Sequence, residues 1–509
     1  MPKQDVFHLH PLGWENDPEE ERFKVSTLDY LTACTYNNYA LFFRVDDTDK
    51  AQVADVLKAG LERTLSQVRH ICGTIEKDPS GGHSFVKKKD STVQFVVQWL
   101  DSPEDSDAYP DFDKIAEGNF CTSVLGDLSR WSVPPMTYGE KPEAHPDSSP
   151  VVAAYKVNFI RGGLVFIMHH HHYSNDVMGW AGLVHQLAEN CYAIVNQTPF
   201  PSWDSACLDL SLLTKPIVPE ASRIDGPPMP ERYPGHIAAE MLLFHLPKSK
   251  AAELKALATP TDGSTDRSID GSIDGSTDGS TDGSTESTDG SWISTYDAFS
   301  AFIWRTVSRL RAPVFKPDLS APLLWIEAVD MRRRMHNPKV PARIQHNVMT
   351  GAISSTAPVT APTAAEVISE WPLSKIASYI RQLTDSITQE GLDQMLDVVA
   401  TVRDKTALNI RIDSHPPMSL LQTDHRDVNI TAADFGFAKP FTYRHLIDRL
   451  TQGVVIIYPS RDMSAESDEG PEFSISYETS LKQALIEDPE WNKYFEYRGI
   501  DAIDAQQDL

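Results

Sequence analysis

The chain changes from an apolar strand to an amphipathic helix within one stretch, residues 164–195, which reads LVFIMHHHHYSNDVMGWAGLVHQLAENCYAIV. Residues 151–168 are typical of a pair of strands, because they are almost continuously apolar around two glycines. From Val177 onward the apolar residues recur at helical spacing, which predicts an amphipathic helix. A strand that passes directly into a helix indicates an α/β fold. Four consecutive histidines, His169–His172, stand at the junction.

His172 is the candidate general base at this junction. Side chains alternate along a strand, so His170 and His172 share one side, and only His172 stands four residues before the acid Asp176. Imidazole accepts and returns a proton near neutral pH, because its unperturbed pKa is about 6.5. Two plainer interpretations stay open for so short a pattern: a polar strand end with buried histidines, or a fortuitous metal site. Asp176 can also cap the helix, which stabilises it by about 1 kcal/mol.

A second segment, Asp434–Pro440, reads DFGFAKP. An Asp-Phe-Gly triplet suggests a protein kinase, all the more because His425-Arg426-Asp427 precedes it. Only seven residues separate Asp427 from Asp434, too few for a catalytic loop and the strands after it, and no glycine-rich phosphate loop precedes them. The two segments together, in this order, instead resemble the HxxxD and DFGWGxP motifs of the BAHD family of CoA-dependent acyltransferases.

The resemblance covers nearly the whole chain apart from an acidic insert. It implies an α/β fold of two similar chloramphenicol-acetyltransferase-like domains with a solvent channel between them. The implied activity is esterification of a hydroxyl on a small secondary metabolite, with acetyl-CoA as the expected donor and co-substrate. No permanently bound cofactor and no metal are expected. Fungal toxin, terpenoid and alkaloid O-acetyltransferases are the nearest branch.

The resemblance also assigns roles to individual residues. His172 would be the base, and Asp176 would point away from the substrate and pair with an arginine, for which Arg332 in the segment VDMRRR is the candidate. Thr423 stands where the family often has a hydroxyl that faces the reacting carbonyl, and such a hydroxyl can donate to the developing oxyanion. An ordinary loop threonine is the open alternative.

Asp434 and Gly436 would hold a loop that lies off the active site and near the CoA channel. Three departures from the family pattern concern the acceptor pocket and loop packing: Val177 follows the motif acid where glycine is common, His425 replaces tryptophan, and His346-Asn347 replaces Gly-Asn.

CoA carries several phosphates, whereas the chain has a net charge of −26. The site must therefore gather cations locally, and the candidates are Arg305, Arg309 and Lys439, with Arg311 and Arg333 as further possibilities. Arginines on a helix are more often simply solvated. The strong negative charge argues against nucleic acid as a partner.

The chain of 509 residues predicts two domains. We expect an N-terminal domain over 1–210, a proline-rich crossover over 211–240, and a C-terminal domain over 241–509. Residues 261–291 repeat Asp, Gly, Ser and Thr with a period near four, which predicts a disordered surface loop. A calcium site needs acids at alternating positions or a nonapeptide register, and this period supplies neither.

Five scattered cysteines without a CxxC pair indicate reduced thiols in the cytoplasm. The sequence shows no signal peptide and no membrane-spanning apolar run, so we expect no membrane partner, and we expect a monomer. One rival is a free-standing condensation domain of peptide assembly, which takes acyl groups from carrier proteins. Another is an inactive homologue that sequesters a metabolite. The identity of the acceptor is not legible in the sequence.

Overall fold

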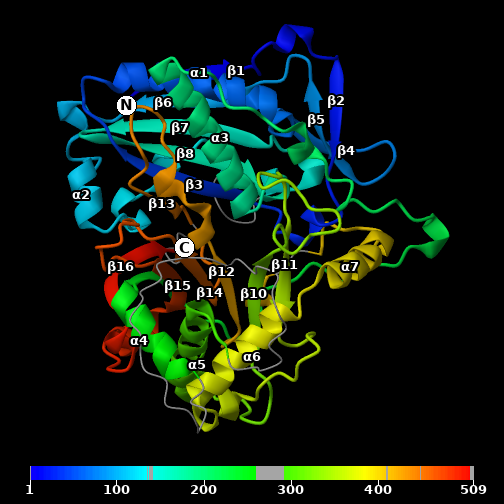
Figure 1. Ribbon diagram of the computed structural model, residues 1–509, viewed down its shortest axis with the longest axis vertical. Coiled ribbons are helices and arrows are strands. Elements are labelled where there is room, and N and C mark those ends of the chain that lie inside the picture. The colour runs from blue at the N-terminus through cyan, green and yellow to red at the C-terminus, as the bar shows by residue number, and fades with distance from the viewer. Residues whose placement is uncertain are drawn as a thin grey trace.

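The computed structural model describes residues 2–134, 136, 142–259, 292–408, 411–447 and 449–504. Figure 1 shows two large sheets, one above the other, each with helices packed on it. This arrangement confirms the predicted α/β class. The insert predicted over 261–291 lies outside the described residues.

The first sheet has six strands in the order β1-β6-β7-β8-β3-β13. Its members are β1 (Lys3–Leu9), β6 (Val93–Trp99), β7 (Ala153–Ile160), β8 (Gly163–His171), β3 (Tyr36–Arg44) and β13 (Thr442–His445). Helices α1 (Lys50–Gln67) and α3 (Val177–Asn196) cover one face, with α2 (Phe112–Glu117) against the other. Because both faces are covered, β3 and β8 are buried almost throughout.

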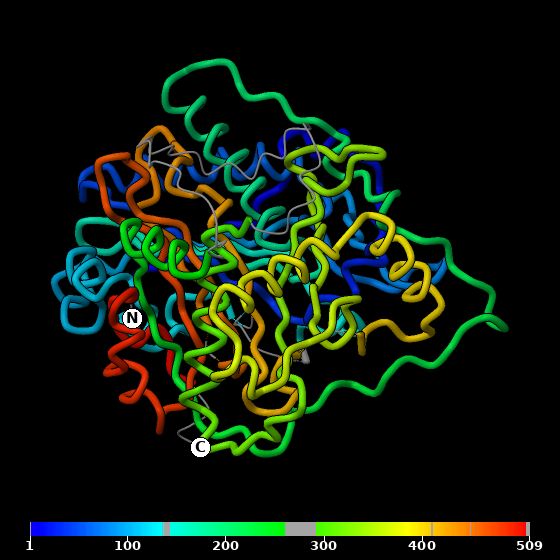
Figure 2. The backbone as a smooth tube through the Cα atoms, turned by 60° about the horizontal axis from the view of Figure 1, so that its bottom comes forward, coloured from blue at the N-terminus to red at the C-terminus, as the bar shows by residue number. Residues whose placement is uncertain are grey.

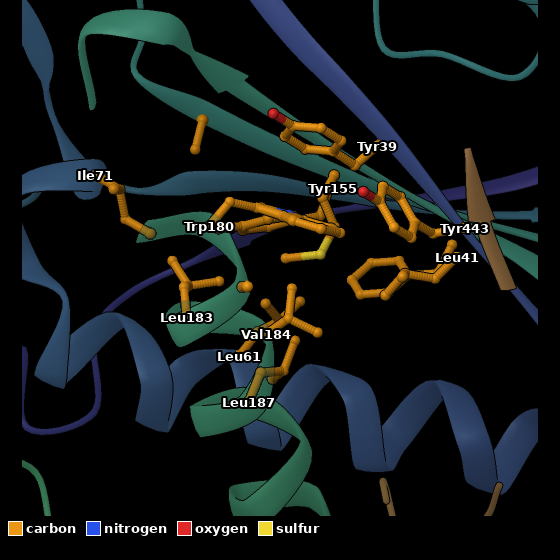
Figure 3. Packing of buried hydrophobic residues seen from close by; sticks show 14 of the residues in the cluster. Tyr39, Leu41, Leu61, Ile71, Tyr155, Trp180, Leu183, Val184, Leu187 and Tyr443 are labelled. Carbon is orange, nitrogen blue, oxygen red and sulfur yellow. The ribbon is translucent and has the colours of Figure 1, made fainter. Parts of the chain in front are cut away.

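The core between this sheet and its helices is built from the apolar stripe that the sequence predicts. Trp180, Leu183 and Leu187 of α3 pack with Leu61 of α1 against strand residues such as Tyr155 (Figure 3). All are nearly or fully inaccessible to solvent. The strand-to-helix junction that carries the histidines is therefore held on both sides by a rigid core.

The second sheet has seven strands in the order β11-β10-β12-β14-β15-β9-β16. Its members are β11 (Met349–Ile353), β10 (Trp325–Asp330), β12 (Leu420–Asp424), β14 (Val454–Tyr458), β15 (Glu472–Glu478), β9 (Ala239–His245) and β16 (Glu496–Ile503). Helices α4 (Lys248–Ala258), α5 (Thr295–Phe315) and α6 (Leu373–Asp385) pack against it. Helix α5 begins with a capping box in which Ser294 and Asp297 bond to each other's backbone N–H groups.

One strand of the first sheet comes from the C-terminal half of the chain. β13 comes from the C-terminal half, yet it pairs antiparallel with β3 of the first sheet, with Tyr443 opposite Leu41. The domain boundaries at residues 210 and 241 that the sequence predicts assign β13 to the C-terminal domain, although it belongs to the first sheet. Because β12 of the second sheet and β13 of the first are only 17 residues apart (424 to 442), the segment between them ties the two sheets together.

Smaller elements complete the fold. A third sheet joins β2 (Glu20–Lys24), β5 (His83–Lys88) and β4 (Thr74–Lys77), and two further helices are α7 (Gln389–Thr401) and α8 (Lys482–Ile486). Figure 2 shows the crossover between the halves as a long green segment on the periphery, and Ile224 within it pairs with Val402 beyond α7. Within the described ranges, no helix is long and apolar enough to cross a bilayer.

Candidate functional site

His172 lies on a turn, not on the strand. β8 ends at His171, and His172–Ser174 form a single 3-10 turn before α3. The strand alternation predicted for His170 and His172 therefore ends at His171, and it does not determine the side on which the His172 side chain lies. The strand ends because the Nδ1 of His171 accepts the backbone N–H of Tyr173 at 3.1 Å, which fixes the turn. The backbone N–H of His172 donates to the carbonyl of Thr35 at 2.8 Å.

The three preceding histidines are fully buried. His169 lies 2.6 Å from Asn38 Oδ1 and accepts the backbone N–H of Val133 at 3.0 Å, and His171 Nε2 lies 2.7 Å from the carbonyl of Ala144. His170 packs against the ring of Tyr155. The plainer interpretation, buried strand-end histidines, thus holds for these three, whereas His172 alone is partly exposed.

The metal interpretation finds no support in the part of the chain that the structure describes. No group of three or more His, Cys, Asp or Glu side chains there could hold a metal ion.

The surroundings of His172 favour a neutral imidazole. Burial lowers the pKa of His172 below its ordinary 6.5, while its own backbone carbonyl and the carboxylates of Asp176 and Asp29 limit the fall. Its Nδ1 is buried without a well-aligned partner among the described residues, so the accessible side of the ring carries Nε2. A neutral ring with an accessible nitrogen is the state that a general base requires.

Asp176 is held by the arginine that the sequence nominated. Arg332 donates from Nη1 to one carboxylate oxygen and from Nη2 to the other, each at 2.9 Å. Asp176 also caps α3 by accepting the N–H of Gly179 at 2.7 Å, and it accepts the N–H of Val348 at 2.8 Å. Burial alone would raise the pKa of Asp176, but Arg332 and the N–H groups of Gly179 and Val348 together outweigh burial, and the pKa is lowered. The predicted pairing is present.

Asn347 and Asp29 support the turn from behind, and sequence reasoning gave neither of them a role in the site. Asn347 Nδ2 donates to the carbonyl of His172 at 2.8 Å and to Asp29 Oδ1 at 2.9 Å. His346 has φ +69°, the left-handed region, which explains why the family favours glycine there. The one sign of Asn347 in the sequence was the replacement of a Gly-Asn pair by His346-Asn347.

Thr423 lies near the end of β12 and is partly exposed. Its Oγ1 is 3.1 Å from Nε2 of His425, whose Nδ1 is 2.9 Å from the hydroxyl of Tyr443. Burial lowers the pKa of His425 to about 4. Through His425 and Tyr443, Thr423 is linked to Trp180 of α3, the helix that follows the histidine turn. The role of Thr423 stays a prediction.

The DFGFAKP segment clamps the first sheet to α3. Phe435 is buried and meets Phe43 of β3 edge to face at 5.1 Å. Gly436 has φ +81°, and a Cβ there would stand 2.9 Å from the Cα of Tyr192 in α3. Phe43 lies seven residues along β3 from Tyr36, which is paired with His171, so this contact is about 23 Å from the turn at roughly 3.3 Å per residue. Its distance from the turn fits a structural role.

The residues proposed for the CoA phosphates are divided between the two sheets. Arg305 donates to the carbonyls of Val367 and Trp371, and Arg309 pairs with Asp488 at 2.8 Å. Both belong to α5, on the second sheet. Lys439 is exposed on the DFGFAKP segment, which packs on the first sheet. Their role in binding CoA remains a prediction. This arrangement does not support a single cationic patch made of all three residues.

A cavity of about 790 Å³ lies beside Tyr30, and neither His172 nor Thr423 is among its lining residues. It is lined by the chain around β2, the hairpin between β4 and β5, the crossover, and the segment after α7. One lining residue, Tyr30, meets the ring of Tyr173 at 5.5 Å. The hydroxyl of Tyr173 lies 2.9 Å from Sγ of Cys34. One wall of the cavity therefore reaches the residue next to His172.

Comparisons with known proteins agree with this geometry. A model of the Transferase family matches residues 15–470. The chain is 66% identical to "Acetyltransferase FGR3" of Gibberella zeae, over 98% of this chain and 95% of that protein. It is 24% identical to "Trichothecene 3-O-acetyltransferase TRI101" of Fusarium sporotrichioides, over 91% of this chain and 94% of that protein.

Solved structures share the fold. The structure of F. graminearum TRI101 complexed with coenzyme A and deoxynivalenol aligns with a TM-score of 0.73 at 22% identity, over 94% of this chain and all of that chain. Vinorine synthase aligns with a TM-score of 0.64 at 18% identity, over 99% of this chain and all of that chain. The chain therefore belongs to the Transferase family, the BAHD acyltransferases that its two motifs resemble, and it is an acyltransferase.

Proposed function

We propose that the protein is an O-acetyltransferase that transfers an acetyl group from acetyl-CoA to a hydroxyl of a small secondary metabolite, with His172 as general base. The observation that carries the proposal is the exposure of His172 alone among four histidines, with a lowered pKa and its turn fixed by Asn347. The 66% identity to an acetyltransferase supports the acetyl donor.

The proposed reaction balances with this chain's own groups. Nε2 of His172 takes the proton of the acceptor hydroxyl, whose oxygen bonds to the thioester carbonyl carbon. The carbonyl oxygen becomes an oxyanion, to which the hydroxyl of Thr423 donates a hydrogen bond. The carbon–sulfur bond then breaks, and His172 returns the proton to the departing thiolate to give CoA thiol. A positioned base contributes a factor of about 10²–10⁴ to the rate.

The cavity beside Tyr30 is a proposed entry for the acceptor, because Tyr30 contacts Tyr173, the neighbour of His172. Its volume of about 790 Å³ lies within the range of small-molecule pockets, about 300–1,000 Å³. Relatives named for trichothecene and eremophilane O-acetylation support a polycyclic terpenoid alcohol as acceptor. His172 and Thr423 come from one chain, which supports action as a monomer. Action in the cytoplasm is proposed only from the scattered cysteines.

The rivals considered from the sequence are less well supported. A condensation domain takes its acyl group from a carrier protein, whereas the named relatives are acetyltransferases over nearly the whole chain. A protein that only sequesters a metabolite needs no neutral, accessible imidazole, whereas His172 provides one.

A screen with purified enzyme tests the proposal. Acetyl-CoA is offered with deoxynivalenol, T-2 toxin and a set of eremophilane alcohols, and both released thiol and acetylated product are measured, the product by mass spectrometry. We expect acetylation by the wild type, and a rate about 10²–10⁴ lower for His172→Ala with its melting temperature unchanged. His8→Ala, on the exposed edge of β1, is the matched control and should keep the full rate. Equal rates for the two variants would refute the role of His172.

A further inference from the structure

Three side chains form a hydrogen-bonded chain that ends at the proposed oxyanion donor. Thr423 Oγ1 lies 3.1 Å from His425 Nε2, and His425 Nδ1 lies 2.9 Å from the hydroxyl of Tyr443. His425 and Tyr443 are buried, and Thr423 is partly exposed. The ring of Tyr443 packs against Trp180 and Tyr458, so its hydroxyl is fixed in direction. The order of donors along this chain decides what the Thr423 proton can do.

Hydrogen-bond satisfaction sets that order. Among the residues that the structure describes, the hydroxyl of Tyr443 has no partner besides His425. If His425 carried its proton on Nδ1, the buried proton of Tyr443 would have no acceptor, and an unpaired buried donor is costly. Tyr443 therefore donates to Nδ1, which leaves the proton of the neutral ring on Nε2. Nε2 then donates to Oγ1 of Thr423.

This order of donors determines what the hydroxyl of Thr423 can do. Because Oγ1 accepts from His425, the threonine's own proton is not used within this chain of bonds and is free for another acceptor. We propose that His425 and Tyr443 are positioning residues, which keep the Thr423 hydroxyl a donor toward the oxyanion of acyl transfer. In the opposite tautomer Thr423 would donate to Nε2, and its proton would be lost to the reaction. This proposal rests on the proposed function.

Nitrogen-15 spectra of protein labelled at histidine test the tautomer directly. Long-range correlations separate a bare ring nitrogen from a protonated one, and the spectrum of His425→Gln identifies the signals of His425 by subtraction. We expect Nε2 protonated and Nδ1 bare in the wild type at pH 7, and a loss of this preference in Tyr443→Phe. If His425→Gln does not fold, the signals that change in Tyr443→Phe give the same identification. A proton on Nδ1 in the wild type would overturn the proposal.

A double-mutant cycle of kinetic measurements tests the effect on catalysis. Acetyl-CoA is the donor, and the acceptor is the alcohol that is acetylated in the screen, or water if no alcohol is acetylated. Thr423→Val should lower kcat by about 10²-fold or more, with KM for acetyl-CoA nearly unchanged. His425→Leu should lower kcat by about tenfold or more, and the double variant should be no slower than Thr423→Val alone. His425→Gln, whose amide can reach the place of Nε2, should recover part of the loss.

The outcomes separate this proposal from the proposed function. Losses that multiply in the double variant would show that His425 acts independently of Thr423, and would overturn the positioning role in an enzyme that still acetylates. No thiol release by the wild type would overturn acyl transfer itself, and with it the catalytic use of these bonds, whatever tautomer the spectra show.

Discussion

Arg332 binds both carboxylate oxygens of Asp176, each at 2.9 Å, and neither side chain is more than 8% exposed. With the N–H groups of Gly179 and Val348 added, the carboxylate accepts four hydrogen bonds. A carboxylate so fully occupied has no free position for a substrate proton. The acid of the HxxxD motif therefore fixes the strand-to-helix turn and the second half of the chain to each other.

Arg332→Met should destabilise the fold, because it leaves the buried carboxylate of Asp176 unpaired. Loss of one partner of a buried ion pair costs about 3–5 kcal/mol. The free energy of unfolding in urea measures this cost. Arg333→Met is the matched control, since Arg333 is 65% exposed and its pair with Asp427 at the surface is worth about 0–1 kcal/mol. Equal losses in both variants would show that the Asp176 pair is not structural.

The sequence predicted local features better than those that depend on distant contacts. The strand and the helix after it follow from local spacing, and both are present; the pairing of Asp176 with the distant Arg332 is also present, but the resemblance to a family motif predicted it. The placement of His172 on a strand was wrong, because a histidine side chain, His171, ends the strand by binding the next turn. Strand alternation carries no information about such a bond.

Contacts between distant segments account for what was missed. The backbone N–H of Asn347 donates to Asp29, 318 residues earlier in the chain, and only the folded chain brings them together. The pairing of β13 with the first sheet is a similar case, because four residues of strand carry no mark of their partner. The three buried histidines of the run are identical in sequence to the exposed one, and packing alone distinguishes them.

The rate of acyl transfer should fall in acid as His172 takes up a proton. Burial places the pKa of His172 below 6.5, so kcat/KM should be level above that pH and reach half its value at a lower one. Protonation of His425, with a pKa of about 4, would add a second fall only in stronger acid. A pH profile of kcat/KM from pH 4 to 9 measures both. A midpoint above pH 7 would contradict the proposed environment of His172.

His170→Leu should leave the fold as stable as the wild type or more so at pH 7, because both ring nitrogens of His170 are buried without a partner among the described residues. His169→Leu is the matched contrast. It should cost about 1–3 kcal/mol, because the buried N–H of Val133 loses the acceptor that His169 provides. Urea unfolding of both variants measures the difference. Equal destabilisation of the two would contradict the assignment of bonds.

The stability of His170→Leu relative to the wild type should also depend on pH. Burial lowers the pKa of His170 to about 3, against 6.5 in an unfolded chain. Below pH 6.5 His170 binds a proton in the unfolded chain but not in the folded protein. The free energy of unfolding of the wild type therefore falls as the pH is lowered from 6.5 toward 3. His170→Leu lacks that loss, and its advantage over the wild type should grow by about 1–2 kcal/mol between pH 7 and pH 5. Urea unfolding at both pH values measures the change, and an advantage that stays constant would contradict the buried, neutral state.

Gly436→Ala should destabilise the protein through two separate effects, which a second glycine separates. Gly436 and Gly13 have nearly the same backbone, φ +81° and +80°, so alanine at either position carries the left-handed cost of about 1–2 kcal/mol. At Gly13 an added Cβ meets nothing within 4 Å, whereas at Gly436 it meets Tyr192 of α3 at 2.9 Å. Overpacking of this kind adds about 1–3 kcal/mol. Gly436→Ala should therefore lose more free energy of unfolding than Gly13→Ala, and equal losses would show that the DFGFAKP segment does not press on α3.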